Sequence, residues 1–561
     1  MPLFPKLKKV GGLLVFAVLC SCGGGGGSSS PVPQPEPKPS QSPAPTPQPA
    51  PSVTPTPSPS DVSISGTVNY DYIPHFSNGG LNYNAVEERP VRGATVQLLD
   101  SGSSVVSSTK TDEAGHYSFS VSQNTSYRIR VKAEYLRSTF PGWQVRITDN
   151  TQGNSEYALD GSLSSSGDVD STRDLVATSG WNGSGYGSSS RAAAPFAILD
   201  SVYQELNALL DAGLNKNLPS TEIRWSTKNR ANPGSTADGD INSSHFTPDE
   251  NNIYLLGDAD NDTDEFDRSV VQHEFAHFLE HAVSRSESEG GDHGISDKLD
   301  MRVVFSEGFA NATTALVSGT GYYEDSGGTG QAYGFRFSLE DKVTNIQGFY
   351  SEASVGQLIY DVADPANEAS DPLDMGLSTV YGVLASSDYI NSDAMTSVYL
   401  FLNTLRSVSD APTVGQIDNY AASIGIHGSD EWGSGETNGG SVSGVLPVYA
   451  DLNIGQSTNV CSNDSEGQYN GVDVRRFLKV DISQSRSYGL QILASTQGTG
   501  DSNPNAVLWH RGKVVKVFNS GVVNQEIGSV SLSGGTYVLE VYDYDNVDGS
   551  GGVACFDVSL N

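Results

Sequence analysis

The sequence predicts a multidomain protein in which an N-terminal β-sandwich and a C-terminal β-sandwich flank a central, mainly helical α+β domain. Residues 61–178 and 446–561 contain short segments in which apolar and polar residues alternate, the period of half-buried strands. Residues 179–445 instead place apolar residues at three- and four-residue steps, the period of amphipathic helices. A chain of 561 residues is also too long for one hydrophobic core.

Residues 1–22 have the composition of an export signal, because three lysines precede an apolar run that is too short to span a bilayer. The run ends in Leu-Cys-Ser-Cys, which resembles a bacterial lipobox, where a small residue precedes the cysteine that is lipidated. Cys22 fits this pattern best, Cys20 is the second choice, and an ordinary secretory signal is the remaining alternative. The resemblance implies an exported protein that is lipid-anchored at the outer membrane or cell surface.

Residues 23–60 are rich first in glycine and serine and then in proline, so they cannot form a hydrophobic core. We expect a spacer whose glycine part is flexible and whose proline part is semi-rigid. Such a spacer would hold the folded part of the chain away from the membrane.

Residues 61–178 begin the folded part. We predict strands here at 63–68, 94–99, 116–121 and 127–131. Gly-Thr-Val at 66–68, followed by Val-Arg-Gly-Ala-Thr-Val-Gln-Leu-Leu-Asp at 91–100 and Thr-Asp-Glu-Ala-Gly-His-Tyr-Ser-Phe at 111–119, resembles the carboxypeptidase-regulatory-like β-sandwich. The segment offers no catalytic set, so a spacer or stabilising role is favoured over a binding role.

The strongest chemical motif is His-Glu-Phe-Ala-His at 273–277, inside an apolar pattern that predicts a helix. His273 and His277 are four residues apart, so both imidazoles leave the same face of that helix. Two nitrogens placed in this way can bind one Zn²⁺, and Glu274 between them can take a proton from the water that the metal activates. The motif is a metalloprotease signature. The alternative is a surface helix that carries His and Glu for solubility, but histidine is scarce, at 9 of 561 residues.

A catalytic zinc takes three protein ligands, so a third is needed. The metzincin continuation requires Gly at position 280 and His at 283, where this chain has Glu280 and Val283, and that class is disfavoured. Glu307 is the best candidate, because it is a single acid in an apolar segment and a buried unpaired carboxylate is costly. The alternative partner for Glu307 is Arg302.

His-Glu-Phe-Ala-His followed by Ser-Glu-Gly-Phe-Ala-Asn-Ala resembles the gluzincin clan of zinc metallopeptidases, over residues 190–445 and specifically at these two motifs. The resemblance implies a gluzincin-like catalytic domain in which His273, His277 and Glu307 are the zinc ligands and Glu274 is the general base. It also implies a Tyr or His that stabilises the oxyanion. The tyrosine candidates are Tyr322, Tyr323, Tyr350 and Tyr360.

Other positions around these motifs have open roles. His293 lies in a glycine-rich loop, where a solvated position is favoured over contact with substrate. Glu352 opens a helix, either as a cap or as a contact near the metal. By the gluzincin resemblance, the strand predicted at 252–256 would be an edge strand that pairs with an extended peptide. Beyond Glu307, helices are predicted at 334–342, 353–364, 378–386, 393–408 and 412–426.

The segment Asp258–Glu265 is dense in carboxylates, and hard oxygen ligands at alternate positions suit Ca²⁺. It is not an EF-hand, because the Gly and the distal Glu are in the wrong places. The favoured interpretation is capping, in which Asp264 or Asp267 stabilises the N-terminus of the His-Glu-Phe-Ala-His helix. Calcium binding is the alternative.

Residues 446–561 again predict strands, and their arrangement resembles the pre-peptidase C-terminal β-sandwich of secreted bacterial proteases. The residues leave open whether this module binds substrate polymer or is removed on maturation. Cys461 and Cys555 are the only cysteines after the signal, and an exported compartment is oxidising, so we predict a disulfide between them.

Together these features predict a zinc-dependent endopeptidase tethered to the bacterial cell surface, with a protein or peptide substrate and a membrane contact through the lipid alone. The chain has 66 Asp plus Glu against 32 Lys plus Arg, which argues against nucleic acid as a partner. We expect a monomer. The alternatives are a non-catalytic adhesin or polymer-binding lipoprotein with a vestigial zinc site, and a gluzincin-like hydrolase that acts on something other than peptides.

Overall fold

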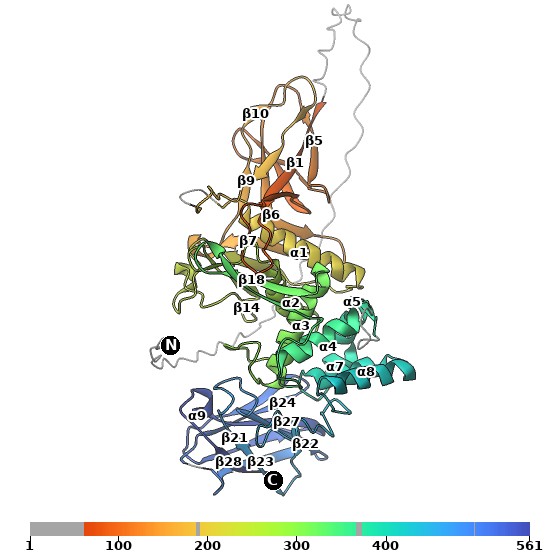
Figure 1. The fold of residues 1–561 in the computed structure, drawn as a ribbon, viewed down its shortest axis with the longest axis vertical. Coiled ribbons are helices and arrows are strands. Elements are labelled where there is room, and N and C mark those ends of the chain that lie inside the picture. The colour runs from red at the N-terminus through yellow and green to blue at the C-terminus, as the bar shows by residue number, and fades with distance from the viewer. Residues whose placement is uncertain (1–60, 187–190, 366–372, 499) are drawn as a thin grey trace, which may run out of the picture. The chain divides into compact units, whose positions relative to one another are not determined.

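The computed structural model describes residues 61–186, 191–365, 373–498 and 500–561 (Figure 1). The predicted signal, the lipidation site at Cys22 and the spacer at 23–60 lie outside the described residues. Several sheets and a group of helices make up the described chain, with separate apolar cores among them. Within these residues, no helix combines the length and the apolar character that a membrane-spanning segment needs.

Two sheets that begin in residues 61–177 share one apolar core. In β1 (Asp61–Tyr72) every second residue is buried, so one face of the strand enters the core. The strands predicted at 63–68, 94–99, 116–121 and 127–131 are present. The remaining elements are β2 (Glu87–Pro90), β3 (Ala94–Asp100), β4 (Val105–Lys110), β5 (His116–Ser122), β6 (Ser126–Arg137), β7 (Trp143–Asp149), η1 (Asn150–Gln152), β8 (Ser155–Glu156), β9 (Ala158–Asp160), β10 (Ser164–Ser165), β11 (Ser171–Thr172) and β12 (Leu175–Ala177).

The larger of these sheets continues past residue 178, where the sequence predicted a domain boundary. Strand β13 (Thr221–Trp225) pairs in parallel with β7, and β15 (Asn252–Leu255) pairs in parallel with β13. Helix α1 (Ala194–Asp211) packs on this sheet with buried Phe196, Leu199, Val202 and Leu206 in the same apolar core. The core therefore joins the N-terminal β region to the start of the helical region.

The prediction that residues 252–256 form an edge strand is wrong. Strand β14 (His245–Thr247) pairs antiparallel with β15, and β13 pairs with its other side, so β15 has neighbours on both edges. All four residues of β15 are buried, which fits an interior strand. An extended peptide therefore cannot pair with β15 while β14 stays in place. Three further short elements are η2 (Thr236–Asp238), β16 (Gly257–Asp258) and β17 (Asp262–Thr263), of which β16 and β17 pair with each other.

Helices dominate the region from residue 268 to residue 423. Figure 1 shows α2 (Arg268–Val283) and α3 (Met301–Ser318) beside each other, drawn in green, with α4 (Glu352–Ala363) next in line. Gly308 brings α3 and α4 into backbone contact, because a Cβ at this position would lie 2.8 Å from the Gly356 nitrogen. The helices that follow are α5 (Gly376–Leu384), α6 (Ser387–Ile390), α7 (Val398–Ser407) and α8 (Ala411–Ser423).

The helix predicted at 334–342 is absent, and a β-hairpin takes its place. Strand β18 (Tyr322–Gly327) pairs antiparallel with β19 (Tyr333–Ser338), and the short turn η3 (Thr329–Gln331) precedes β19. Tyr333, Phe335 and Phe337 are spaced by two residues, which is the strand period. The hairpin places Tyr323 against His273 of α2 and brings Asp325 into the acidic cluster described below.

The C-terminal region forms two packed sheets around its own core. A disulfide joins Cys461 on β21 (Ser457–Ser462) to Cys555 on β28 (Ala554–Leu560), which are paired neighbours in the antiparallel register. The predicted disulfide is therefore present. The other elements are β20 (Tyr449–Asp451), β22 (Arg475–Ile482), β23 (Arg486–Ala494), β24 (Pro504–His510), β25 (Lys513–Phe518), β26 (Gln525–Leu532), β27 (Gly535–Asp543) and α9 (Tyr544–Val547).

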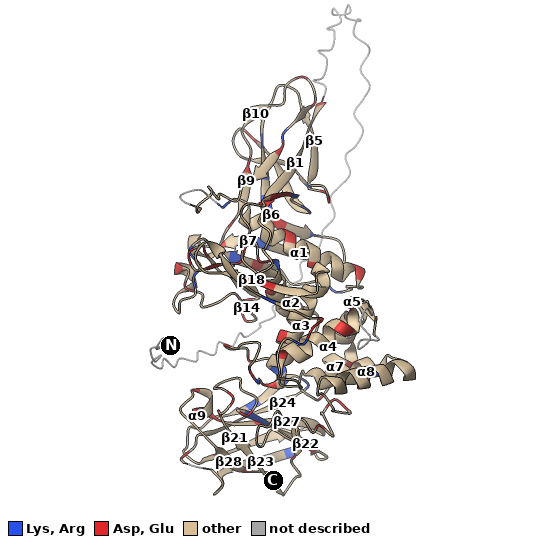
Figure 2. Cartoon of the chain, viewed as in Figure 1, with Lys and Arg blue, Asp and Glu red and all other residues tan. Residues whose placement is uncertain are grey.

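Acidic residues outnumber basic ones in the sequence, and basic residues form few groups of their own among the described residues (Figure 2). Figure 2 shows the basic residues of the described chain scattered among acidic ones along the strands, helices and loops. Several of the basic side chains are paired with acids inside the protein, as Arg191 is with Glu265 at 2.8 Å.

Candidate metal centre

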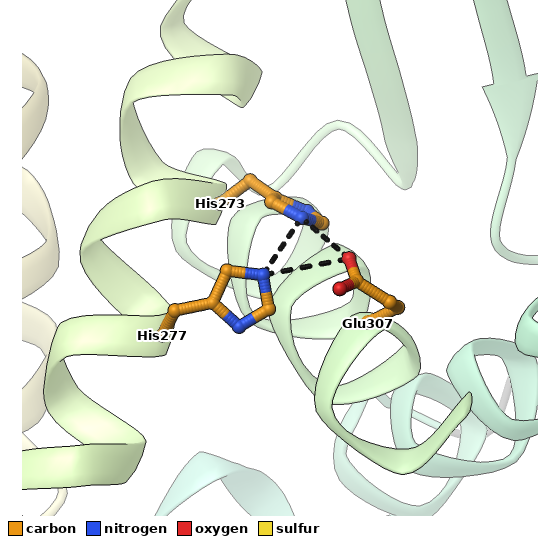
Figure 3. Close-up of side chains that lie close together, drawn as sticks. All are labelled: His273, His277 and Glu307. Carbon is orange, nitrogen blue, oxygen red and sulfur yellow. Dashed lines mark hydrogen bonds and ion pairs between the residues drawn. The ribbon is translucent and has the colours of Figure 1, made fainter. Parts of the chain in front are cut away.

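Three side chains that the sequence singled out meet at one point between α2 and α3 (Figure 3). His273 Nε2 lies 3.0 Å from Glu307 Oε2, His277 Nε2 lies 3.4 Å from the same oxygen, and the two ring nitrogens are 3.1 Å apart. The apolar residues of α2, among them Val271, Phe275, Phe278 and Leu279, are buried on its other faces and fix the helix in the core. The pair of histidines therefore faces α3 as the four-residue spacing requires.

The distances between these three atoms match the donor spacing of a small tetrahedral metal site. With metal–ligand bonds of about 2.0–2.1 Å, two tetrahedral ligands are about 3.3–3.4 Å apart. The observed 3.0–3.4 Å separations fall at or just inside this value. Two imidazoles and one carboxylate are also donors that Zn²⁺ accepts in open catalytic sites.

Hydrogen bonds fix the tautomer of His273. Its Nδ1–H donates to Asn311 Oδ1 at 3.0 Å, because an amide oxygen can only accept. Asn311 is itself held in this orientation, since its Nδ2 donates to Glu352 Oε1 at 2.6 Å. The Nε2 of neutral His273 therefore carries a lone pair, directed at the centre of the site.

His277 is held in the same way by different residues. The Ser306 hydroxyl donates to Glu280 Oε2 at 2.7 Å, so its oxygen accepts from His277 Nδ1–H at 3.1 Å. The Nε2 of His277 is then also free of a proton in the neutral ring. When both rings are neutral, these lone pairs lie 3.1 Å apart and repel each other, and either a proton on His277 Nε2 or a metal cation between the rings removes the repulsion.

The electrostatics of the site favour a cation. Burial alone would raise the pKa of Glu307, but the charge of His277 and hydrogen bonds to His273 and His277 hold that pKa well below its usual range. Burial alone would lower the pKa of His277, and the charge of Glu307, its hydrogen bond and the charge of Glu274 raise it to about 9. A site that attracts a proton so strongly also attracts a divalent metal, which competes for the same nitrogen.

Glu274 is buried, with 8 % of its surface exposed, and it follows His273 on α2. Its carboxylate lies near enough to the centre that its charge contributes to the raised pKa values of His277 and Tyr323. Glu274 therefore lies beside the metal centre, but it is not one of the three residues whose donor atoms converge there.

Of the four tyrosines considered for the oxyanion, Tyr323 lies against the site. Its ring packs edge-on against His273, with 5.8 Å between ring centroids. The Tyr350 hydroxyl lies within hydrogen-bond distance of two acceptors, Gln347 O and Asn438 Oδ1. Tyr360 donates to Glu340, and the Tyr322 ring packs under Arg336. The hairpin that replaces the predicted helix is what carries Tyr323 to His273.

The expectation that His293 is solvated holds for the residue as a whole, which is exposed, but its side chain also reaches the metal centre. Its Nε2 lies 3.6 Å from Glu307 Oε2 and 3.6 Å from Glu352 Oε2, and its side chain is 22 % exposed. Burial by itself lowers the pKa of His293, but hydrogen bonding and charge from Glu307 and the charge of Glu352 raise it to about 10. His293 therefore borders the metal centre from the loop between α2 and α3.

Sequence reasoning missed Asn311, Ser306 and Glu280. Asn311 follows Glu307 by one helical turn and Ser306 precedes it directly, so helical spacing within Ser-Glu-Gly-Phe-Ala-Asn-Ala would have placed both near the histidines. The pairing that the sequence offered as an alternative for Glu307 is absent. Arg302 instead contacts Asp300, Glu289 and Glu540.

A second cluster of acids lies near the N-terminus of α2. The carboxylates of Asp262, Asp264, Asp267 and Asp325 offer oxygens within 4.8 Å of one another. Asp267 stands at the N-cap position of α2 but makes no capping hydrogen bond; its oxygens accept from Ser326 and contact His75 at 2.6 Å. Burial raises the pKa of Asp264 and Asp325 well above their usual range, and burial with the charge of Asp267 raises that of Asp262 to about 7. The favoured capping interpretation is therefore wrong for Asp267.

One protein-family model matches part of the sequence. Residues 84–156 match the carboxypeptidase regulatory-like domain, which confirms that part of the predicted resemblance. No curated protein matches the sequence significantly.

Solved structures resemble separate stretches of the chain. The pre-peptidase C-terminal domain of a collagenase from Bacillus anthracis is 17% identical, over 20% of this chain and 94% of that one, with a TM-score of 0.15. The precursor of protealysin, a metalloproteinase from Serratia proteamaculans, is 12% identical, over 52% of this chain and 89% of that one, with a TM-score of 0.30. At these values the likenesses carry no argument about activity.

Proposed function

We propose that this chain is a zinc-dependent endopeptidase, exported and tethered to the cell surface through a lipid on Cys22. The observation that carries the proposal is the convergence of His273 Nε2, His277 Nε2 and Glu307 Oε2 at 3.0–3.4 Å, with both ring tautomers set by Asn311 and Ser306. A zinc ion, when bound, supplies positive charge that polarises a carbonyl and acidifies water.

Residues of this chain have the other roles in hydrolysis. His273, His277 and Glu307 hold the ion, and Asn311 and Ser306 keep the two rings turned toward it. Glu274 accepts the proton of the attacking water and passes it to the nitrogen of the leaving amine. Tyr323 is the tyrosine placed to donate a hydrogen bond toward the oxygen of the substrate carbonyl, because its ring contacts His273.

We expect the purified protein to contain one zinc per chain and to cleave members of a peptide library, with cleavage lost on adding a zinc chelator and restored by zinc. Metal analysis measures the zinc content, and mass spectrometry of the library measures peptide cleavage, so the two results are obtained independently. Stoichiometric zinc without peptide cleavage would favour a hydrolase of another substrate. Absence of both would favour the adhesin or polymer-binding lipoprotein with a vestigial site.

Calcium binding stays a prediction, now for Asp262, Asp264, Asp267 and Asp325. Asp262 Oδ1 and Asp325 Oδ1 are buried oxygens without a hydrogen-bond partner among the described residues, and four close carboxylates repel one another unless a cation or protons lie among them.

With calcium at about 100 times its dissociation constant, the free energy of unfolding should rise by about 2.7 kcal/mol. We expect this as a calcium-dependent increase in Tm that Asp325→Asn abolishes. The exposed Asp341 serves as the control, and Asp341→Asn should keep the full increase. An equal Tm with calcium and with a chelator in the unaltered protein would contradict the prediction.

A further inference from the structure

A loop of the C-terminal region holds the loop that follows α2. This segment, residues 463–472 between β21 and β22, is called the clamp loop below. Tyr469 Oη donates to the carbonyl of Glu289 at 3.1 Å, and Asn470 Nδ2 donates to the carbonyls of Gly290 and Asp292 at 3.1 and 3.3 Å. Three carbonyls just before His293 are thus bound by two side chains that lie far away in the sequence.

The clamp loop also binds the far end of the same segment through backbone atoms. Val472 N donates to Lys298 O at 3.0 Å, and Asp300 N donates to Asn470 O at 2.8 Å. Leu299 and Gly471 form an isolated antiparallel bridge between these two contacts. Residues 289–300 are therefore fastened at both ends by one stretch of the C-terminal sandwich, immediately before α3 begins.

Buried charges join the same two parts. Glu289 contacts Arg302 at 2.8 Å and Arg475 at 3.1 Å, and Glu540 contacts Arg302 at 3.1 Å and Arg475 at 2.9 Å. Trp509 Nε1 adds a hydrogen bond to Glu540 at 2.8 Å. Each carboxylate is shared by an arginine of the helical region and one of the sandwich, so separating the two parts would leave buried charges without partners.

The clamp loop contacts the residues that orient His293. The Nδ1–H of His293 donates to Gly291 O at 2.8 Å, which turns Nε2 toward Glu307 and Glu352. Gly291 has φ +103°, and a Cβ there would lie 2.6 Å from the Tyr469 ring, so only glycine fits between this ring and the loop. Tyr469 itself has φ +69°, a conformation that non-glycine residues rarely adopt outside constrained sites.

We propose that the C-terminal sandwich is a working part of the metal centre, in which Asn470 and Tyr469 position His293 so that its Nε2 contacts the substrate beside Glu307. The inference rests on the proposed function. Asn470 is a positioning residue that acts through His293, and the sandwich is needed for hydrolysis itself. Removal of the sandwich on maturation would release residues 289–300 and is excluded by this proposal.

The test uses full-length His293→Ala, Asn470→Ala and the double variant, with Asn459→Ala as the matched control. Asn459 lies on β21, before the clamp loop, and its side chain donates to Asp557 at 2.8 Å, within the sandwich. We expect Asn470→Ala to lower kcat/KM roughly 10- to 100-fold at unchanged zinc content. The double variant should lose no more than His293→Ala alone, because Asn470 acts through that histidine. Asn459→Ala should match the unaltered protein.

Amide hydrogen exchange of residues 289–299 provides a readout that does not depend on activity. Asn470→Ala should speed this exchange and Asn459→Ala should not. If Asn470→Ala does not fold, Asn470→Asp keeps the side-chain size and removes the donor, and the same results are expected of it. Losses that multiply in the double variant, or unchanged exchange in the Asn470 variants, would overturn the proposal. If the unaltered protein cleaves no peptide, the proposed function fails, while the exchange result still decides whether the clamp loop holds His293.

Discussion

Replacing Glu274 with glutamine is expected to lower kcat/KM for peptide cleavage roughly 100- to 10,000-fold, the range that general base catalysis contributes. Glutamine has the size of glutamate and keeps a hydrogen-bonding oxygen, but it cannot accept a proton from water at neutral pH. The three converging donors come from His273, His277 and Glu307, so the zinc content should stay at the level of the unaltered protein.

Metal analysis, Tm and cleavage of a library peptide together check this prediction. Glu88→Gln is the matched control, because Glu88 is exposed on β2 and contacts Asn69. That variant should retain zinc, Tm and activity. A Glu274→Gln protein that cleaves at the parent rate would show that another group removes the proton. Loss of zinc from it would instead place Glu274 among the ligands.

The part of the site that could be predicted from the sequence is the part that lies on single helices. His273 and His277 share a face because they are four residues apart, and this holds in any helix. Glu307 lies on a different helix, so helical spacing could not place it near the histidines. It was predicted as a ligand because a buried carboxylate without a partner is costly. The disulfide followed from there being a single pair of cysteines after the signal.

One placement that the sequence does not show, that of the His293 side chain, depends on contacts between distant segments. His293 reads as solvated because its neighbours are glycines and acids, yet Asn470, 178 residues beyond Asp292, holds its loop against the metal centre. The edge-strand role of residues 252–256 was implied by the gluzincin resemblance, and it fails because β14, the strand directly before β15 in the sequence, pairs with that edge. The helix predicted at 334–342 is wrong because Tyr333, Phe335 and Phe337 have the two-residue period of a strand, which a local pattern already indicates.

The partners of Arg302 also could not be predicted from the sequence. Arg302 is a buried arginine in the same helix as Glu307 and needs a carboxylate partner, and Glu307 is the acid within that helix. The structure supplies Asp300, Glu289 and Glu540 instead, and Glu540 lies on β27 of the C-terminal sandwich. Glu307 is thereby left free of arginine and remains available to a metal.

Replacing Glu307 with alanine is expected to remove zinc and activity together. The variant keeps both imidazoles but loses the one anionic donor, and a two-histidine site without charge binds zinc far more weakly. Replacing residues that only orient ligands costs about 10- to 100-fold in metal affinity, so loss of a ligand should cost more than about 100-fold. Competition with a chromophoric chelator measures this affinity directly.

Glu352→Gln is the comparison that makes the Glu307 result decisive. Glu352 is also buried, and His293 Nε2 lies 3.6 Å from both acids, so position near the site does not distinguish them. The Glu352 carboxylate accepts from Asn311, whereas Glu307 Oε2 faces both imidazole nitrogens. Because a glutamine oxygen can still accept from Asn311, Glu352→Gln should keep its zinc. If Glu352→Gln loses zinc and Glu307→Ala keeps it, the third ligand is Glu352 and the role assigned to Glu307 is wrong.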